Sequence, residues 1–263
     1  IIGGGYIGLE FACFFNEVGA KVTVYEMLPN IAAGADQEIA ARLQSVLSRR
    51  GIEFKLSSRI AEIAPGEYYL NATGRAPNVH NLGLEELHVD FTPRGIRTSD
   101  QGKTNVPGLW ACGDVTGRRM LAHAATREGI VAVNNMFGKK DRIRYRAIPA
   151  VIYTHPEVAS VGATEEELKS NGIAYKKSVV PMAIAGRFLI ENENPAGTLK
   201  VLTGARYNEL LGVHALGDGS SEFIVAAAAM MEKEMSAGEG AQVVFPHPTV
   251  SEALHAALAS ASK

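Results

Sequence analysis

Short apolar runs alternate with amphipathic stretches over the first 60 residues, as is typical of a βαβ unit. The spacing predicts an apolar helix over 7–18 and an amphipathic helix over 36–50. Strands are predicted at 1–2, 21–25 and 52–55, each a short run rich in apolar and β-branched residues. Strands that alternate with helices in this way predict an α/β fold with a parallel sheet.

From about Arg146 the pattern predicts a separate α+β domain. Thr164 followed by Glu167 predicts a capping box at the start of a helix. An Ala- and Met-rich helix is predicted from Ser220 to Met235, with an apolar surface broader than one stripe. Such a helix is buried against the sheet, against a partner subunit, or by core packing alone, and all three remain open. Further strands are predicted at 147–153, 157–162, 199–202 and 210–216.

Composition excludes several kinds of partner. The 263 residues are 46% hydrophobic, and 26 Lys and Arg against 28 Asp and Glu give a net charge of -2 without a basic run, so we expect no nucleic-acid partner. The longest apolar run, 223–231, is too short to cross a membrane. The seven histidines lack zinc-site spacing, so we expect no metal. Cys13 and Cys112 stand in apolar segments and are expected to be buried structural thiols.

The turn between the first strand and the first helix carries the spacing Gly3, Gly5, Gly8. Glycines in this pattern make a tight turn and allow backbone amides to approach a pyrophosphate at a helix start, although a purely structural glycine turn is the alternative. The strand at 21–25 ends on Glu26, the position of an acid that binds ribose hydroxyls. Its negative charge would repel a 2'-phosphate, so NAD is favoured over NADP.

Near the C-terminus, His247 and Glu252 bracket the start of a helix predicted to run to Ser260. An imidazole oriented by a carboxylate is a general acid/base pair. The competing interpretation is a capping box made by Thr249 and Glu252, with the histidine as an incidental loop residue.

Five motifs occur in the order found in the flavin-dependent pyridine nucleotide-disulfide oxidoreductases, which the whole chain resembles. They are A-T-G-R-A-P-N at 72–78, W-A-C-G-D-V at 110–115, M-L-A-H at 120–123, Y-T-H-P-E at 153–157 and H-P-T-V-S-E at 247–252. The resemblance implies an oxidoreductase that oxidises dihydrolipoamide through an enzyme disulfide and FAD, with hydride transfer to NAD. A glutathione or mercuric reductase type of enzyme, or a truncated non-catalytic nucleotide-binding and dimerisation module, is the alternative.

The resemblance also implies roles for individual residues. The pair at the C-terminus would be catalytic, with His247 as the acid/base and Glu252 as its orienter. The residues expected to bind FAD are Asp114, Met120, Leu121, Ala122 and His123. Those expected to bind NAD are Gly3, Gly5, Gly8, Glu10, Glu26, Ile60 and Gly74.

The implied organisation is an NAD-binding domain at 1–72, the C-terminal part of an FAD domain at 73–145, and an α+β interface domain at 146–263. The family's N-terminal FAD fingerprint and its C-x4-C disulfide are absent, and the NAD domain is incomplete at 57–70. Either segments of a longer protein are joined here or a natural deletion has occurred. The expected partners are a second copy of the chain and a lipoyl-bearing protein of a 2-oxoacid dehydrogenase or glycine cleavage complex, with no membrane contact, in the cytoplasm or the mitochondrial matrix.

Overall fold

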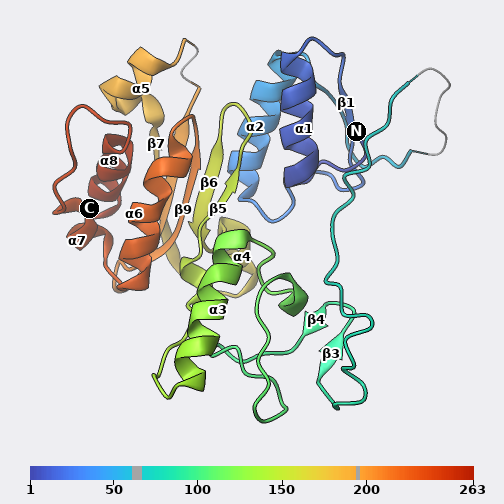
Figure 1. Cartoon of the computed structure of the whole chain (residues 1–263). Helices are drawn as coiled ribbons and strands as arrows, with labels where there is room; N and C mark the ends of the chain where they lie inside the picture. Colours follow the sequence, from blue (N-terminus) through green and yellow to red (C-terminus); the bar gives the residue numbers. More distant parts are fainter. Residues whose placement is uncertain (61–66, 194–195) are drawn as a thin grey trace. The chain divides into compact units, whose positions relative to one another are not determined.

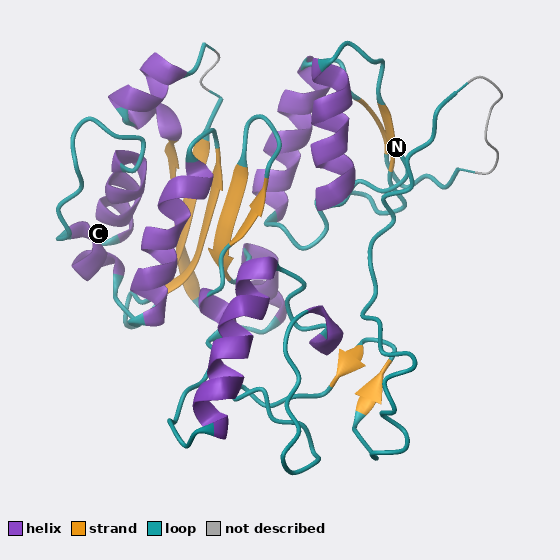
Figure 2. Cartoon of the chain, in the orientation of Figure 1, coloured by secondary structure: helices purple, strands orange, loops and turns teal. Residues whose placement is uncertain are grey.

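The chain divides into two compact units in a computed structural model that describes residues 1–60, 67–193 and 196–263 (Figure 1). The first unit comprises Ile1–Gly74 and Pro149–Lys263, and the second comprises Arg75–Ile148. Figure 2 shows the helices and strands of each. Among the described residues, no helix combines the length and apolar character needed to cross a membrane.

The first unit begins with α1 (Tyr6–Glu17), β1 (Thr23–Tyr25), α2 (Gln37–Arg49) and β2 (Glu53–Lys55). β1 and β2 pair in parallel, so this part of the predicted α/β unit is confirmed. The strand end predicted at 1–2 is present as parallel bridges of Ile2 to Tyr25 and to Asn71, and it is short because the glycine turn begins at the next residue. Part of the interval predicted to be incomplete, residues 61–66, lies outside the described residues.

α2 has the amphipathic pattern that its sequence predicts. Asp36 caps its start, accepting hydrogen bonds from the backbone N–H groups of Glu38 at 3.2 Å and Ile39 at 3.4 Å. The residues buried along it recur at positions i, i+1, i+4 and i+8, on one face of the helix, and belong to the core that also contains residues of α1 and β1. They are Ile39, Ala40, Leu43 and Leu47.

The rest of the first unit contains, within the described residues, an antiparallel sheet in the order β5-β6-β9-β8-β7. Its strands are β5 (Ala150–Ile152), β6 (Val158–Gly162), β7 (Tyr175–Pro181), β8 (Thr198–Gly204) and β9 (Leu210–Leu216). Sequence analysis missed β7, because an edge strand carrying two lysines and ending in proline lacks the apolar signal of a central strand. β5 begins later than predicted, after Pro149.

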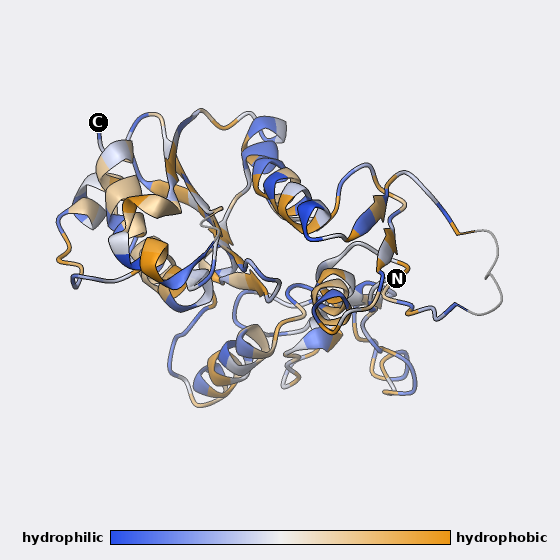
Figure 3. Ribbon diagram, turned by 90° about the horizontal axis from the view of Figure 1, so that it is seen from above, coloured by the Kyte–Doolittle hydropathy of each residue, from blue (hydrophilic) through white to orange (hydrophobic). Residues whose placement is uncertain are grey.

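Helices cover this sheet. Their bounds are α4 (Glu165–Ser170), η3 (Met182–Ile184), α5 (Gly186–Glu191), α6 (Ser220–Glu232), α7 (Ala237–Ala241) and α8 (Glu252–Ala261). The capping box of Thr164 and Glu167 at α4 is confirmed. α6 packs against β6 and β9, and α8 packs against β7 and β8. The C-terminal helices carry much hydrophobic colour in Figure 3, which fits their burial against the sheet.

The predicted end of α6 at Met235 is wrong, because the helix stops at Glu232. Glu234 adopts a left-handed conformation with φ 57°, and its N–H donates to the carbonyl of Met231 at 3.1 Å. The N–H of Met235 donates to the carbonyl of Met230 at 3.0 Å, which completes a Schellman motif. Inside the chain the buried residues of α6 meet the sheet, while Val225 is 61% exposed.

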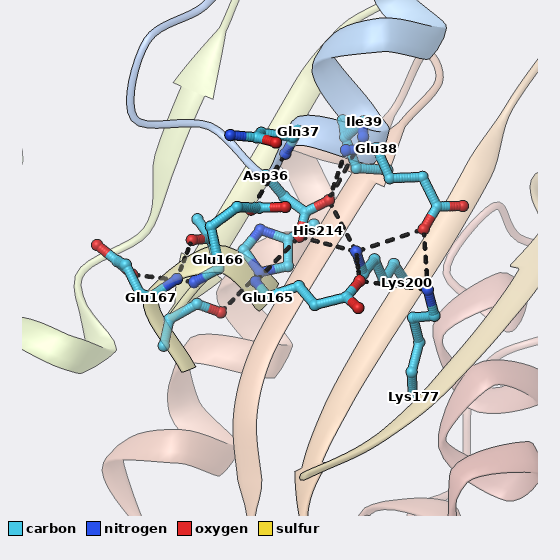
Figure 4. A network of polar contacts seen from close by, with 12 residues as sticks. Asp36, Gln37, Glu38, Ile39, Glu165, Glu166, Glu167, Lys177, Lys200 and His214 are labelled. Carbon is cyan, nitrogen blue, oxygen red and sulfur yellow. Dashed lines mark hydrogen bonds and ion pairs between the residues drawn. The ribbon is translucent and has the colours of Figure 1, made fainter. Parts of the chain in front are cut away.

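An ionic cluster fastens the start of α2 to the sheet and to α4 (Figure 4). We call Asp36, Glu38, Glu165, Lys177 and Lys200 the Lys200 cluster. Lys200 lies on β8, which is buried along its whole length, and its Nζ donates to Asp36 at 2.9 Å and to Glu165 at 2.5 Å. The side chain of Lys200 is 0% exposed, so these bonds replace its hydration shell.

The second unit has a smaller core, formed around Val79, Leu84, Val89 and Ile96. Its hairpin consists of β3 (Phe91–Thr92) and β4 (Gly95–Ile96), which pair in antiparallel fashion. The other elements are η1 (Asp114–Thr116), α3 (Ala122–Met136) and η2 (Tyr145–Ala147).

Candidate active site and cofactor sites

The glycine turn at the start of α1 is built by close backbone contact. A Cβ on Gly8 would lie 1.9 Å from the carbonyl oxygen of Gly3, and Gly3 has φ 106°. Only glycine fits at these two positions, since a side chain at either would push the helix away from the turn. The turn predicted from the spacing of the glycines is therefore present in the described residues.

The start of α1 and the carboxylate of Glu26 lie next to each other at this turn. Gly5 is the N-cap of α1, and a Cβ placed on it would meet nothing within 4 Å, so a pyrophosphate can approach the helix start there. Glu26 Oε2 accepts a hydrogen bond from the N–H of Gly4 at 2.7 Å, and its Oε1 accepts one from Leu28 at 2.7 Å. Each carboxylate oxygen keeps a second acceptor site, which two ribose hydroxyls can use.

The other residues predicted to bind NAD have different surroundings. Glu10 lies on α1, and its Oε1 accepts a hydrogen bond from the backbone N–H of Tyr153 at 2.9 Å. Glu10 therefore ties α1 to the residue that follows β5. Ile60 is half-buried and Gly74 is exposed with φ 110°. The contact of Glu10 is long-range in sequence, so no local motif could have revealed it.

The residues predicted to bind FAD lie together on one stretch of the second unit. Asp114 is the first residue of η1 and is exposed. Met120 is 41% exposed, Leu121 is the N-cap of α3, and Ala122 and His123 are exposed in the first turn of that helix. This stretch thus presents a carboxylate and the start of a helix to its surroundings.

His247 and Glu252 form the contact that the sequence predicts. The Nδ1 atom of His247 lies 2.8 Å from Glu252 Oε1, and the His247 side chain is 81% exposed. The N–H of Thr249 donates to the other oxygen of Glu252 at 2.9 Å. The hydrogen bonds from Thr249 and His247 lower the pKa of Glu252, so the carboxylate is ionised at neutral pH and holds the imidazole by Nδ1.

The competing capping box is wrong in one of its two bonds. In a capping box the hydroxyl of Thr249 would accept a hydrogen bond from the backbone N–H of Glu252. Here it donates to the carbonyl of Pro246 at 2.8 Å. The N-cap of α8 is Ser251, and the helix ends at Ala261, one residue beyond the predicted Ser260. Glu252 therefore binds the backbone N–H of Thr249 with one oxygen and the imidazole of His247 with the other. The half of the capping box that is present is compatible with the pairing of His247 and Glu252.

A second histidine–carboxylate pair, which sequence analysis missed, repeats this local geometry. His155 Nδ1 lies 2.8 Å from Asp218 Oδ2, and Asp218 Oδ1 accepts the N–H of Glu157 at 3.1 Å. In both pairs the carboxylate binds the histidine and the N–H two residues later, and both histidines precede a cis proline. The repeated His-Pro dipeptide is the only signal in the sequence, because Asp218 comes from a distant loop.

The prediction that both cysteines are buried is wrong. Cys112 is exposed and Cys13 is half-buried, and both are free thiols. The apolar neighbours of Cys112 in sequence misled the prediction, because the segment 110–113 forms no helix or strand that would turn its side chain inward.

Comparisons with known proteins agree with the fold and with the order of these sites. Residues 1–129 match the family model "pyridine nucleotide-disulphide oxidoreductase", and residues 148–258 match the dimerisation domain of the same family. The chain belongs to the pyridine nucleotide-disulphide oxidoreductases. Members of this family use FAD and a pyridine nucleotide, and the dihydrolipoyl dehydrogenases use FAD and NAD.

Two relatives and one solved structure define the similarity further. The chain is 39% identical over 278 residues to dihydrolipoyl dehydrogenase 3 of Pseudomonas putida, covering 98% of this chain and 59% of that enzyme. It is 38% identical to the mitochondrial dihydrolipoyl dehydrogenase of Mesocricetus auratus, covering 96% of this chain and 58% of the enzyme. The crystal structure of LpdA from Mycobacterium tuberculosis shares the fold, with a TM-score of 0.90 at 24% identity, over 98% of this chain and 60% of that one. The chain thus spans somewhat less than two thirds of these relatives.

Proposed function

We propose that the chain is part of a dihydrolipoyl dehydrogenase, which oxidises dihydrolipoamide and reduces NAD. The observation that carries the proposal is the contact of 2.8 Å between His247 and Glu252, since this pair can handle the proton of a thiol. The similarity to named dihydrolipoyl dehydrogenases at 38–39% identity supports the choice of substrate. The domains proposed are NAD-binding at 1–72, FAD-binding at 73–145 and interface at 146–263.

The ionised Glu252 supports this role. An ionised Glu252 accepts the proton-bearing Nδ1 of His247, which leaves Nε2 as the basic nitrogen of the ring. A dithiol is mostly protonated at neutral pH, whereas only its thiolate attacks a disulfide. Nε2 of the exposed imidazole takes the thiol proton, and the negative charge of Glu252 stabilises the imidazolium that forms.

The cofactors of this reaction are FAD and NAD. Bound FAD supplies the electron transfer between thiols and the pyridine nucleotide. Gly3, Gly5 and Gly8 bind the pyrophosphate of NAD at the start of α1, and Glu26 binds the ribose. On the flavin side, Asp114 binds the ribityl chain, and residues 120–123 line the ring.

The redox disulfide of the reaction is not formed within this chain, whose two cysteines are both free. Residues 148–258 match a dimerisation domain, which supports a homodimer. In such a dimer His247 serves an active site that also needs residues beyond this chain. The proposed partner is a lipoyl-bearing protein of a 2-oxoacid dehydrogenase or glycine cleavage complex. The proposed location is the cytoplasm or the mitochondrial matrix, since the named relatives include a mitochondrial enzyme.

The decisive experiment compares two half-reactions of the FAD-loaded protein at its natural length. His247→Gln should slow dihydrolipoamide oxidation about 100-fold or more, because the thiol proton loses its acceptor. Electron transfer from NADH to an artificial acceptor should remain within about twofold, because it involves no thiol proton. His255→Gln is the matched control, since His255 lies on α8, the helix that Glu252 begins, and its Nε2 lies 3.0 Å from the carbonyl oxygen of Ala241. Equal loss of both activities in His247→Gln would assign this histidine a structural role.

Nucleotide preference tests the other half of the proposal. Glu26 should make kcat/KM for NAD about tenfold to hundredfold higher than for NADP. This ratio corresponds to the free energy of one hydrogen bond between a charged group and its partner, made with the ribose of NAD and lost with the 2'-phosphate of NADP. Glu26→Arg should reduce or reverse this ratio of kcat/KM values. A protein that uses both nucleotides equally well would contradict the assignment of Glu26.

A further inference from the structure

One buried acid in the second unit has no part in the function proposed above. Glu128 lies on α3 and is 3% exposed. Its Oε2 accepts a hydrogen bond from the backbone N–H of Gly113 at 2.6 Å, and its Oε1 accepts one from the hydroxyl of Tyr145 at 2.7 Å. Burying a carboxylate costs several kcal/mol of folding free energy unless the group is hydrogen-bonded. We therefore expect the role of Glu128 to lie in holding the two donors, Gly113 and Tyr145, in place.

The first donor fixes the peptide that precedes Asp114. Gly113 has φ 80° and ψ -160°, a conformation that is essentially confined to glycine. Its carbonyl accepts the hydroxyl and the N–H of Thr116, both at 2.9 Å. Gly113 is therefore bound on its N–H side by Glu128 and on its carbonyl side by η1, which sets the direction in which Asp114 leaves the turn.

The second donor is itself held from both sides. The Arg118 guanidinium lies 3.7 Å from the centroid of the Tyr145 ring, and its Nη2 donates to Asp100 at 2.8 Å. Burial and the hydrogen bond to Glu128 raise the pKa of Tyr145 well above its usual range. The hydroxyl of Tyr145 therefore keeps its proton at neutral pH and donates it to Glu128.

We infer that Glu128 is a positioning residue for the flavin site, holding the Gly113–Asp114 turn, and that Tyr145 in turn holds Glu128. The inference rests on the proposed role of Asp114 toward FAD. It extends that role to residues 14 and 31 positions further along the chain, which no local motif connects to the turn.

Amide hydrogen exchange tests the inference without FAD. In the 263-residue chain, Glu128→Ala should speed exchange at the Gly113 amide about tenfold to hundredfold, as expected for a lost bond to a charged acceptor. Glu128→Gln should stay within about threefold of wild type, because an amide oxygen still accepts from Gly113 and the amide N–H₂ donates to Tyr145. Unchanged exchange at Gly113 in Glu128→Ala would overturn the inference.

Tyr145→Phe provides a milder variant in case Glu128→Ala does not fold. It should also speed exchange at Gly113, by about threefold to tenfold, since the carboxylate loses one of its two anchors. The matched control is Tyr175→Phe, which removes the hydroxyl that donates to Glu165 at 2.7 Å in the first unit. Equal exchange at Gly113 in the two phenylalanine variants would contradict a specific role for Tyr145.

FAD affinity separates this inference from the proposed function. In the protein at its natural length, Asp114→Ala and Glu128→Ala should each weaken FAD binding by about tenfold or more, and Glu128→Gln by less than about threefold. If Asp114→Ala weakens FAD binding and Glu128→Ala does not, positioning by Glu128 is refuted. If Asp114→Ala has no effect, the flavin role of Asp114 fails, and the exchange data alone decide whether Glu128 holds the turn.

Discussion

Two regions of the first unit pair bases with acids, and they differ most in exposure. In the Lys200 cluster the lysine side chain is 0% exposed and Asp36 is 0% exposed, whereas the His247 side chain is 81% exposed. The Nζ atom of Lys200 has three carboxylates within 3.4 Å, those of Asp36, Glu165 and Glu38. The imidazole of His247 uses one nitrogen and presents the other to its surroundings.

This difference separates a structural pair from a chemical one. Burial makes each missing partner costly, so the Lys200 cluster fixes where α2 begins relative to the sheet and α4. Exposure makes the bond of His247 to Glu252 weak as a stabilising contact, but it leaves a titratable nitrogen accessible to a substrate. We expect substitutions in the first region to change stability, and substitutions in the second to change rates.

The largest expected effect is that of Lys200→Met, which leaves the Asp36 carboxylate buried without its cation and removes from Glu165 the one fully buried lysine that it contacts. The free energy of unfolding should fall by about 3–5 kcal/mol, measured by chemical denaturation. Lys177→Met is the matched control: it contacts the same Glu165 at 3.2 Å, but its side chain is 40% exposed, so the loss should stay below about 1 kcal/mol. Similar losses in both variants would show that burial does not distinguish the two lysines.

A triple variant sharpens the same point. Neutralising Asp36 and Glu165 as Asn and Gln in the Lys200→Met background should recover a large part of the lost stability. The loss in the single variant comes from uncompensated buried charge rather than from missing attraction. A triple variant no more stable than Lys200→Met would indicate that the packing of the lysine chain, and not its charge, is what matters.

Sequence patterns predicted the elements near the glycine turn at residues 3–8 far better than they predicted the Lys200 cluster. The glycine spacing, the amphipathic α2 and the strand ending at Glu26 are local signals, and each predicts its structure within a few neighbours. Lys200 contacts Asp36 across 164 positions, and a lysine in a strand reads as an exposed residue. The pair of His247 and Glu252 was predictable because its members lie five residues apart, whereas the pair of His155 and Asp218 was not.

Glu252→Gln tests the chemical region, with an expected effect of about tenfold. The amide still accepts a hydrogen bond but no longer stabilises the imidazolium electrostatically, so dihydrolipoamide oxidation should slow about tenfold. The loss should be greatest in kcat rather than KM, because the charge develops as the proton moves. The thermal midpoint should change little. A large drop in thermal midpoint with unchanged kcat would move Glu252 into the structural class.

Acid should act in opposite directions on the wild type and on Lys200→Met. Burial opposes ionisation of Asp36 and Glu165. The hydrogen bonds and positive charges around each carboxylate, of which the bond to Lys200 is the strongest, together outweigh burial and lower the pKa of both in the folded state. The contribution of these two carboxylates to the free energy of unfolding is fully present above their pKa values in the unfolded chain, which are near 4. It is lost as the pH falls through their lower pKa values in the folded protein. Wild-type stability should therefore fall by about 1–2 kcal/mol below pH 4. Lys200→Met should gain stability there, since protonation relieves the buried charge of Asp36, which has lost its cation. Parallel pH profiles of the two proteins would contradict this account.

The smallest expected effect distinguishes a buried histidine from an exposed one. His214 on β9 is 1% exposed, its Nε2 donates to the carbonyl of Ala163 at 2.9 Å, and its buried Nδ1 has no hydrogen-bond partner. Burial lowers its pKa, because a second proton would sit on that unpartnered nitrogen, although the charge of Asp36 opposes the shift. The unfolded chain then binds a proton that the folded chain refuses, so stability should decline by about 1 kcal/mol as pH falls from 7.5 to 5.5. His214→Gln keeps a donor for Ala163 and should flatten this decline, whereas His247→Gln should leave it unchanged. The free energy of unfolding is measured by chemical denaturation at pH values from 7.5 to 5.5. If His214→Gln loses as much stability over this range as the wild type, another group causes the decline, and the burial of His214 does not make it differ from His247 in this respect.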